Sequence, residues 1–120
     1  MSQAKKWLGV SPITAQSIQG DANTGITAAG TTLATATDLT NTLNIVTTAT
    51  DSQGVQLDTG VIGDSQIVYN ATLVSIKVYP SSSSAKINQI TAGSAHLLAP
   101  QTACVYWVAS ATQHIANMSA

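Results

Sequence analysis

Apolar and β-branched residues occur in short runs from residue 26 onward, and turn residues separate the runs. The spacing is about eight to twelve positions, which is typical of all-β sandwiches and barrels. The pattern predicts short strands at residues 31–38, 43–50, 54–57, 66–70, 73–79, 85–90, 96–99, 103–109 and 113–116.

Two of these stretches alternate most clearly between larger and smaller or polar residues. In the stretch 31–38, Leu33, Thr35 and Thr37 share one face of the predicted strand. In the stretch 73–79, apolar residues alternate with polar ones, and Pro80 is expected to end the strand because it lacks a backbone donor. Asn70 tolerates the left-handed backbone of a tight turn, so a hairpin is predicted between the strands 66–70 and 73–79.

The predicted elements indicate an all-β fold. With 120 residues the chain is expected to form one domain with its own core. We expect a single β-sandwich or jelly-roll-like domain of short antiparallel strands over residues 21–120. Residues 1–20 show no sustained period and are interrupted by Pro12, so they predict an N-terminal arm.

Charge is scarce in this chain. It has four lysines and five aspartates, with no arginine and no glutamate, so 8% of its residues are charged. Ordinary soluble proteins are about 25% charged, so this composition predicts a protein packed against other proteins. The net charge of -1 and the lack of a basic cluster argue against a nucleic-acid partner. The apolar run after Trp7 is too short for a signal peptide or a membrane span, so we expect synthesis in a cytoplasm and no membrane partner.

The residue types that carry chemistry are few and do not form a recognisable motif. His96 and His114 have no nucleophile motif near them, and the aspartates stand at predicted turns, where they commonly bond to their own backbone. Asp21–Gly25 resembles the opening of a calcium loop, but the acidic ligand at the far end of such a loop is missing. Cys104 stands in an apolar run and is expected to be a core residue. The sequence therefore predicts no enzyme activity, no catalytic residue, no cofactor and no metal.

The aromatic residues suggest where partners bind. Tyr106 and Trp107 are adjacent in a predicted strand, so one of them is expected to face the core, and the other either extends its polar end to solvent or serves as an interface anchor. Trp7 is the expected anchor of the arm, and the charge-poor strand 31–38 is expected to lie against a partner. The candidate interface residues are Trp7, Leu8, Thr31, Leu33, Thr35, Thr37 and Trp107.

Several short pieces of the chain, in a consistent order, resemble a family of small virion proteins of tailed phages. The pieces are Ile26–Thr40, Asn44–Thr48, Gly54–Leu57, Gly63–Asp64, Val68–Asn70, Val78–Pro80 and Ile87–Asn88. The similarity runs over roughly residues 20–116. It departs from the family at Gln56 and Asp58, where the family commonly has Arg and Pro, and at His114, where a Trp is usual.

The resemblance implies a capsid decoration (cement) protein, with no enzyme activity, no cofactor and a partner made of protein. The leading hypothesis is a homotrimer on the outside of a phage head that bridges subunits of the major capsid protein, and so a virion protein made in the bacterial cytoplasm. The alternatives are a tail or head-fibre component, or a carbohydrate-binding β-sandwich that recognises a host surface. In the carbohydrate-binding alternative, Tyr69, Tyr79 and the loop Asp58–Asp64 would form the groove.

Overall fold

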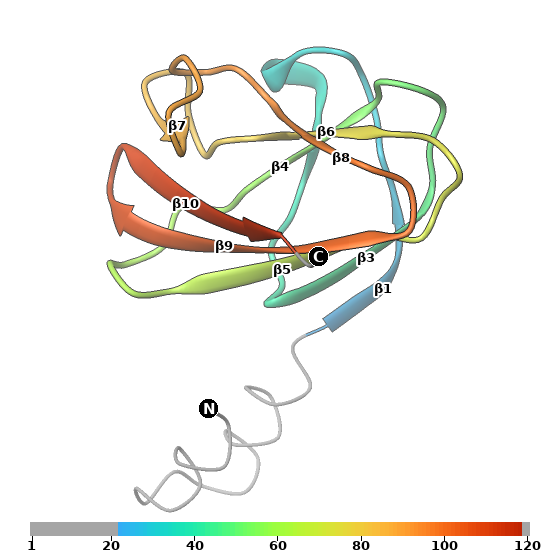
Figure 1. Cartoon of the computed structure of the whole chain (residues 1–120), viewed down its shortest axis with the longest axis horizontal. Coiled ribbons are helices and arrows are strands. Elements are labelled where there is room, and N and C mark those ends of the chain that lie inside the picture. The colour runs from blue at the N-terminus through green and yellow to red at the C-terminus, as the bar shows by residue number, and fades with distance from the viewer. Residues whose placement is uncertain (1–21, 119–120) are drawn as a thin grey trace, which may run out of the picture.

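The chain forms two β-sheets that lie over each other (Figure 1). The computed structural model describes residues 22–118. The larger sheet has six strands in the order β1-β3-β5-β9-β10-β7, and the smaller has four in the order β2-β4-β6-β8. The strands are β1 Ala22–Thr27, β2 Thr37–Asp38, β3 Leu43–Thr48, β4 Gly54–Gln56, β5 Ser65–Asn70, β6 Ile76–Tyr79, β7 Lys86–Ile87, β8 His96–Leu98, β9 Thr102–Ser110 and β10 Gln113–Met118, with one 3-10 helix, η1, at Leu33–Thr35.

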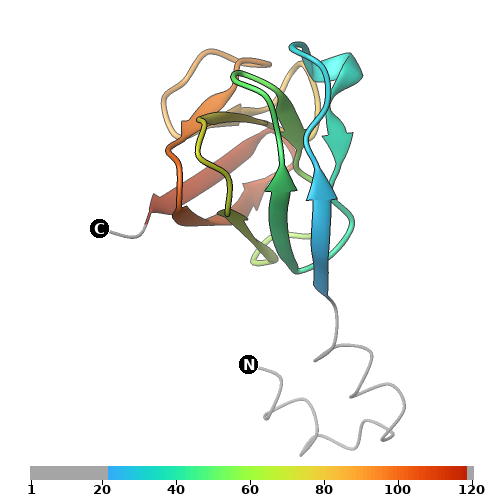
Figure 2. The ribbon, with the colours of Figure 1, turned by 90° about the vertical axis from the view of Figure 1, so that its right-hand side faces the viewer.

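From β1 to β6 successive strands alternate between the two sheets, and each new strand pairs in parallel with the strand of the preceding turn. In the six-stranded sheet β1, β3 and β5 are parallel, and in the four-stranded sheet β2, β4 and β6 are parallel. Figure 2 shows β1 and β3 side by side and pointing the same way. The chain is therefore a parallel-rich β-solenoid of about four turns.

The expected antiparallel β-sandwich or jelly roll is wrong, although the all-β class is confirmed. Alternation along a strand shows which side chains share a face, but it carries no information on the direction of the neighbouring strand. A parallel pair needs a long crossover, which is usually a helix. Here the crossover is a strand of the other sheet, so the parallel pairing left no helical signal in the sequence.

The last strands close the solenoid in antiparallel fashion. β9 pairs antiparallel with both β5 and β10, and β8 pairs antiparallel with β6. β7 pairs in parallel with β10 at the edge of the larger sheet. The predicted hairpin at Asn70 is wrong, because β5 and β6 belong to different sheets.

The predicted strand at 31–38 is also wrong. Its middle forms η1, and only Thr37–Asp38 is a strand. The hydroxyl groups of Thr32 and Thr35 lie 2.8 Å apart, and the Thr32 N–H donates to Thr35 Oγ1 at 3.3 Å. Threonine hydroxyls that bond locally in this way compete with strand pairing. β1 was missed, since its exposed Asn, Thr and Gly residues predict a turn and it becomes a strand only by pairing with β3.

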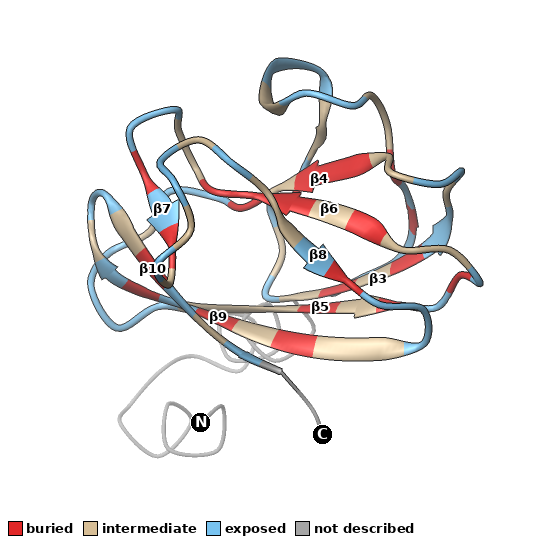
Figure 3. Cartoon of the chain, turned by 45° about the horizontal axis from the view of Figure 1, so that its top comes forward, coloured by how far each residue is buried: buried red, intermediate tan, exposed pale blue. Residues whose placement is uncertain are grey.

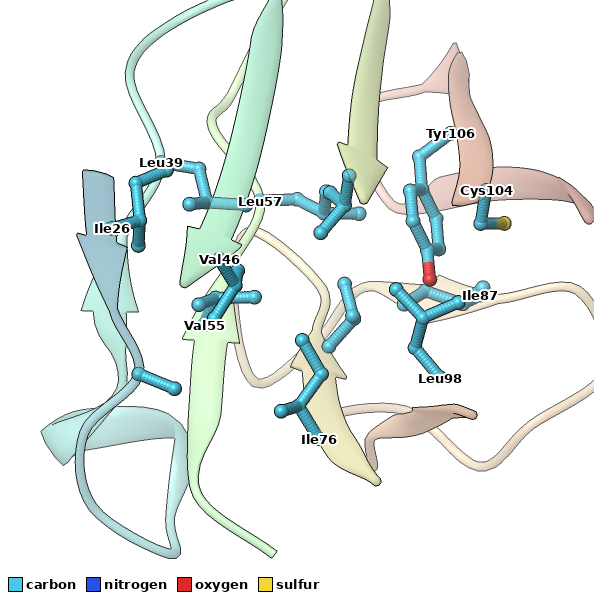
Figure 4. Close-up of a cluster of buried hydrophobic side chains, with 13 residues drawn as sticks. Ile26, Leu39, Val46, Val55, Leu57, Ile76, Ile87, Leu98, Cys104 and Tyr106 are labelled. Carbon is cyan, nitrogen blue, oxygen red and sulfur yellow. The ribbon is translucent and has the colours of Figure 1, made fainter. Parts of the chain in front are cut away.

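The core lies between the two sheets, and strands of both sheets contain buried residues (Figure 3). Figure 4 shows Val46 of β3 against Val55 of β4, with Tyr106 of β9 reaching across toward Leu98 of β8. Cys104 is 1% exposed, as expected of a core residue. Burial raises the pKa of its thiol, which keeps it in the unreactive protonated form.

The expected N-terminal arm, with Trp7 and Leu8, lies outside the described residues. Between residues 22 and 118 no helix has the length and apolar character that crossing a membrane requires.

Candidate protein-interaction surface

The outer face of the six-stranded sheet is formed by every second residue of its strands. In β9, Cys104, Tyr106 and Val108 are buried, so Val105 and Trp107 point away from the core. Trp107 is 44% exposed, whereas Tyr106 is 1% exposed. The prediction that one of these two aromatic residues faces the core is confirmed, and the other is exposed.

Cross-strand pairing arranges the outward-facing residues in three rows. The rows are Leu43 with Ile67 and Val105, Ile45 with Tyr69 and Ala103, and Ser65 with Trp107 and Ile115. We call this set of residues the apolar face. None of them carries a charge, and no other strand or helix of the described chain packs over them (Figure 1). Apolar patches of this kind on a protein surface mark interaction sites.

The connection between β4 and β5 adds two further exposed apolar residues beside this face. Val61 is 71% exposed and Ile62 is 75% exposed. The following residues extend the pairing of β5 with β9, because the Gly63 N–H donates to the Val108 carbonyl oxygen at 2.8 Å. Ser65 then pairs with Trp107. The two exposed residues therefore lie next to the Trp107 end of the apolar face.

Of the candidate interface residues within the described chain, only Trp107 lies on the apolar face. Thr31, Leu33, Thr35 and Thr37 belong to the connection from β1 to β2 and to β2 itself. Two of them have local structural roles: the Thr31 carbonyl oxygen accepts from Tyr79 OH at 2.7 Å, and Thr37 Oγ1 donates to the Thr27 carbonyl oxygen at 2.7 Å. The structure does not bring these four residues together with Trp107.

The remaining residues of the apolar face were not predicted as a protein interface, and only Tyr69 among them was considered, as a sugar contact. Ile67, Tyr69 and Ile115 all lie in strands that were predicted, and their alternation with buried neighbours is visible in the sequence. What the sequence lacked was the strand order that places them side by side. That order depends on parallel pairing between distant segments, which alternation alone does not reveal.

The groove expected of a carbohydrate-binding protein does not form. Tyr69 lies on the outer face of the six-stranded sheet, whereas Tyr79 belongs to the other sheet and is 6% exposed. Tyr79 lines a shallow hollow of about 430 Å³ together with Lys77 and Leu97, but its hydroxyl group is already bonded to Thr31. A buried ring of this kind cannot offer its face to a sugar.

His114 is buried and bonded to the loop that follows β6. Its Nε2 lies 3.1 Å from Ser81 Oγ, and it accepts from the Ser81 N–H at 3.4 Å. Burial lowers the pKa of the imidazole, which favours the neutral form that can accept these bonds. The side chain is 2% exposed, and no carboxylate of the described residues lies within hydrogen-bond distance of it. The arrangement ties β10 to the loop that follows β6.

The aspartates near the apolar face bond to their own backbone, as expected. Asp58 Oδ1 accepts from the Thr59 N–H at 3.0 Å, and Asp64 Oδ2 accepts from the Val61 N–H at 3.0 Å. In the described part of the chain no group of three His, Cys, Asp or Glu side chains is placed to hold a metal ion. The residues of the calcium-loop pattern that are described, 22–25, lie in β1 and not in a turn.

Comparisons of the chain with protein-family models, with curated proteins and with solved structures find no match.

Proposed function

We propose that this chain is a capsid decoration (cement) protein of a tailed phage, which binds other protein subunits through the apolar face. The observation that carries the proposal is the uncharged apolar face on strands β3, β5, β9 and β10, where Trp107 and Ile115 are 44% and 42% exposed. Tyr and Trp are enriched among the residues that contribute most to protein interfaces.

A surface of this kind gains free energy when a partner covers it. Removing apolar area from water contributes about 25 cal/mol per Å², and a stable interface covers about 800 Å² on each partner. The apolar face belongs to paired strands that are backed by the core, so little conformational freedom is lost when it binds. A rigid apolar sheet face is therefore suited to a permanent structural contact.

The sequence resemblance supports the major capsid protein as the partner. A decoration protein bridges neighbouring capsid subunits, and a homotrimer would present three copies of the apolar face at once. Joining three modest contacts raises their effective concentration and gives a tight assembly even where each contact alone is weak.

The proposal is tested by measuring the ratio of this chain to the major capsid protein in purified heads. We expect a fixed ratio that persists in about 1 M salt, because contacts between uncharged groups are barely screened. Trp107→Ser should weaken binding to stripped heads on the order of tenfold or more. Leu97→Ser is the matched control, since Leu97 is 60% exposed but lies on β8 of the other sheet.

Three results would count against this function. They are absence of the chain from heads, its release in high salt, and equal weakening by Trp107→Ser and Leu97→Ser. Recovery of the chain with tails and not with heads would support the tail or head-fibre alternative instead.

A further inference from the structure

The connection between β4 and β5 presents two adjacent apolar side chains on a turn that is held in place. We call Val61 and Ile62 the apolar tip. The Val61 N–H donates to Asp64 Oδ2, and the Asp64 N–H donates back to the Val61 carbonyl oxygen, both at 3.0 Å. On the other side the Val108 N–H donates to the Asp64 carbonyl oxygen at 2.8 Å. These bonds connect the turn to β9.

The two glycines that flank the tip fit this conformation closely. Gly63 has φ +94°, which side-chain-bearing residues rarely adopt. A Cβ at Gly60 would stand 2.8 Å from Asp64 Oδ2, so a larger residue there would displace the carboxylate that orients the turn. The exposure of the tip is thus part of an ordered conformation. A preorganised turn binds with a smaller loss of entropy than a loose one.

The charge around the apolar tip indicates which kind of surface the tip binds. Residues 58–64 carry two carboxylates, those of Asp58 and Asp64, and no lysine. Both aspartates are exposed. The cytoplasmic surface of a membrane is negative and attracts basic segments, so an acidic segment is disfavoured there. An apolar protein pocket with basic residues at its rim complements both the apolar side chains and the carboxylates.

We propose that the apolar tip inserts into an apolar pocket with a basic rim on the protein subunit that covers the apolar face. This inference rests on the proposed function and adds the chemistry of the partner's surface. The tip lies beside the Trp107 end of the face, so one partner subunit can contact both. The face supplies area, and the tip fixes the position of the partner along the strands.

The test compares binding of three variants to stripped heads with binding of the unchanged chain. The double variant Val61→Ser with Ile62→Ser should keep its melting temperature, because both side chains are exposed, yet bind on the order of tenfold or more weakly. Leu73→Ser is the matched control, since Leu73 is 81% exposed but follows the opposite end of β5, and it should bind as the unchanged chain does. Asp58→Asn should bind a few-fold more weakly at low salt, and the difference should vanish in about 1 M salt.

The outcomes separate this inference from the proposed function. If Trp107→Ser weakens binding and the double variant does not, the tip inference is overturned and the function stands. If the unchanged chain does not bind heads, the function is overturned. Sedimentation of the unchanged chain with phosphatidylcholine–phosphatidylglycerol vesicles, abolished in the double variant, would overturn the protein pocket in favour of a lipid surface.

Discussion

At the scale of single residues, Asn70 shows how a polar side chain organises this fold. It is completely buried, and its amide nitrogen lies within 3.2 Å of the carbonyl oxygens of Val74, Leu98 and Ala99. Its Oδ1 accepts from both the N–H and the hydroxyl of Thr72. The sequence pointed to a turn residue here because Asn is common in turns. Its bonds to Thr72 and Val74 are local, as expected of a turn residue, whereas Leu98 and Ala99 come from a distant segment that the sequence could not show.

The bonds of Asn70 predict a large loss of stability for Asn70→Leu. The substitution keeps roughly the same volume but leaves the buried Leu98 carbonyl oxygen and the buried Thr72 N–H without this partner. Each such group costs about 1 to 3 kcal/mol, so the free energy of unfolding should fall by about 3 kcal/mol or more. Urea denaturation measures this. Asn117→Ala changes an exposed asparagine and is the control. It should change the free energy of unfolding by less than about 0.5 kcal/mol. Equal effects of the two substitutions would contradict the role given to Asn70.

At the scale of elements, the positions of several strands could be predicted, whereas their partners could not. The expected strand at 43–50 matches β3, that at 103–109 matches β9, and Pro80 follows the end of β6 as expected. These strands are marked by β-branched runs bounded by turn residues. The direction in which two strands pair depends instead on which sheet the chain enters after each loop. The choice of sheet is set by the burial of apolar side chains throughout the solenoid.

The free edge at β1 is partly blocked by side chains. The Thr27 carbonyl oxygen accepts from Thr37 Oγ1 at 2.7 Å, and the Gly25 N–H donates to Asn23 Oδ1 at 3.1 Å. Open strand edges otherwise pair with other chains. Since these two backbone groups already have partners, contact through the apolar face is favoured over strand addition at β1.

Gly54 in β4 allows a test of how closely β4 and β6 approach each other. A Cβ at this position would stand 2.7 Å from the Tyr79 ring and 3.3 Å from the Lys77 carbonyl oxygen. Gly54→Ala should therefore displace the ring of Tyr79, disturb its bond to Thr31 and lower the free energy of unfolding by about 1 to 3 kcal/mol.

Gly25→Ala is the matched control for Gly54→Ala, because a Cβ at Gly25 in β1 meets nothing within 4 Å. It should leave the free energy of unfolding unchanged or raise it by up to about 1 kcal/mol. Thermal denaturation of both variants measures the difference. A Gly54→Ala protein as stable as the unchanged chain would show that β4 and β6 are less closely packed than described.

At the scale of the whole molecule, the lack of charged residues is a property of one surface, the apolar face. None of the residues of the apolar face is charged, whereas Asp58 and Asp64 stand in the connection beside it. Composition alone predicted contact with other proteins but placed it on the segment 31–38. The sequence identified one residue of the face, Trp107, because adjacency of two aromatic residues in a strand is a local signal. The rows around it arise only when segments from four strands are folded together.

The two sheets are also joined by their histidines. The Nδ1 atom of His96 on β8 lies 2.8 Å from the hydroxyl group of Tyr106 on β9. This contact links the four-stranded sheet to the six-stranded sheet. His114 on β10 is bonded to Ser81, which lies two residues beyond β6 of the four-stranded sheet. Burial lowers the pKa of both imidazoles and raises the pKa of Tyr106. All three groups are thus neutral at pH 7, and protonation of either histidine would place a charge between the sheets.

The depressed histidine pKa values predict that stability falls in mild acid. Both lie below the ordinary value of 6.5 in the folded chain, so the unfolded chain takes up protons first as the pH falls through about 6.5. The free energy of unfolding should therefore be highest above pH 6.5 and should decrease toward pH 5, by about 1.4 kcal/mol for each pKa unit between the two states. Urea denaturation at pH 7.5, 6.5 and 5.5 measures this dependence. A variant with His96→Asn and His114→Gln keeps a polar group at each bonded position and should lose most of the decrease over this range, whereas an unchanged decrease in that variant would assign the effect to other groups.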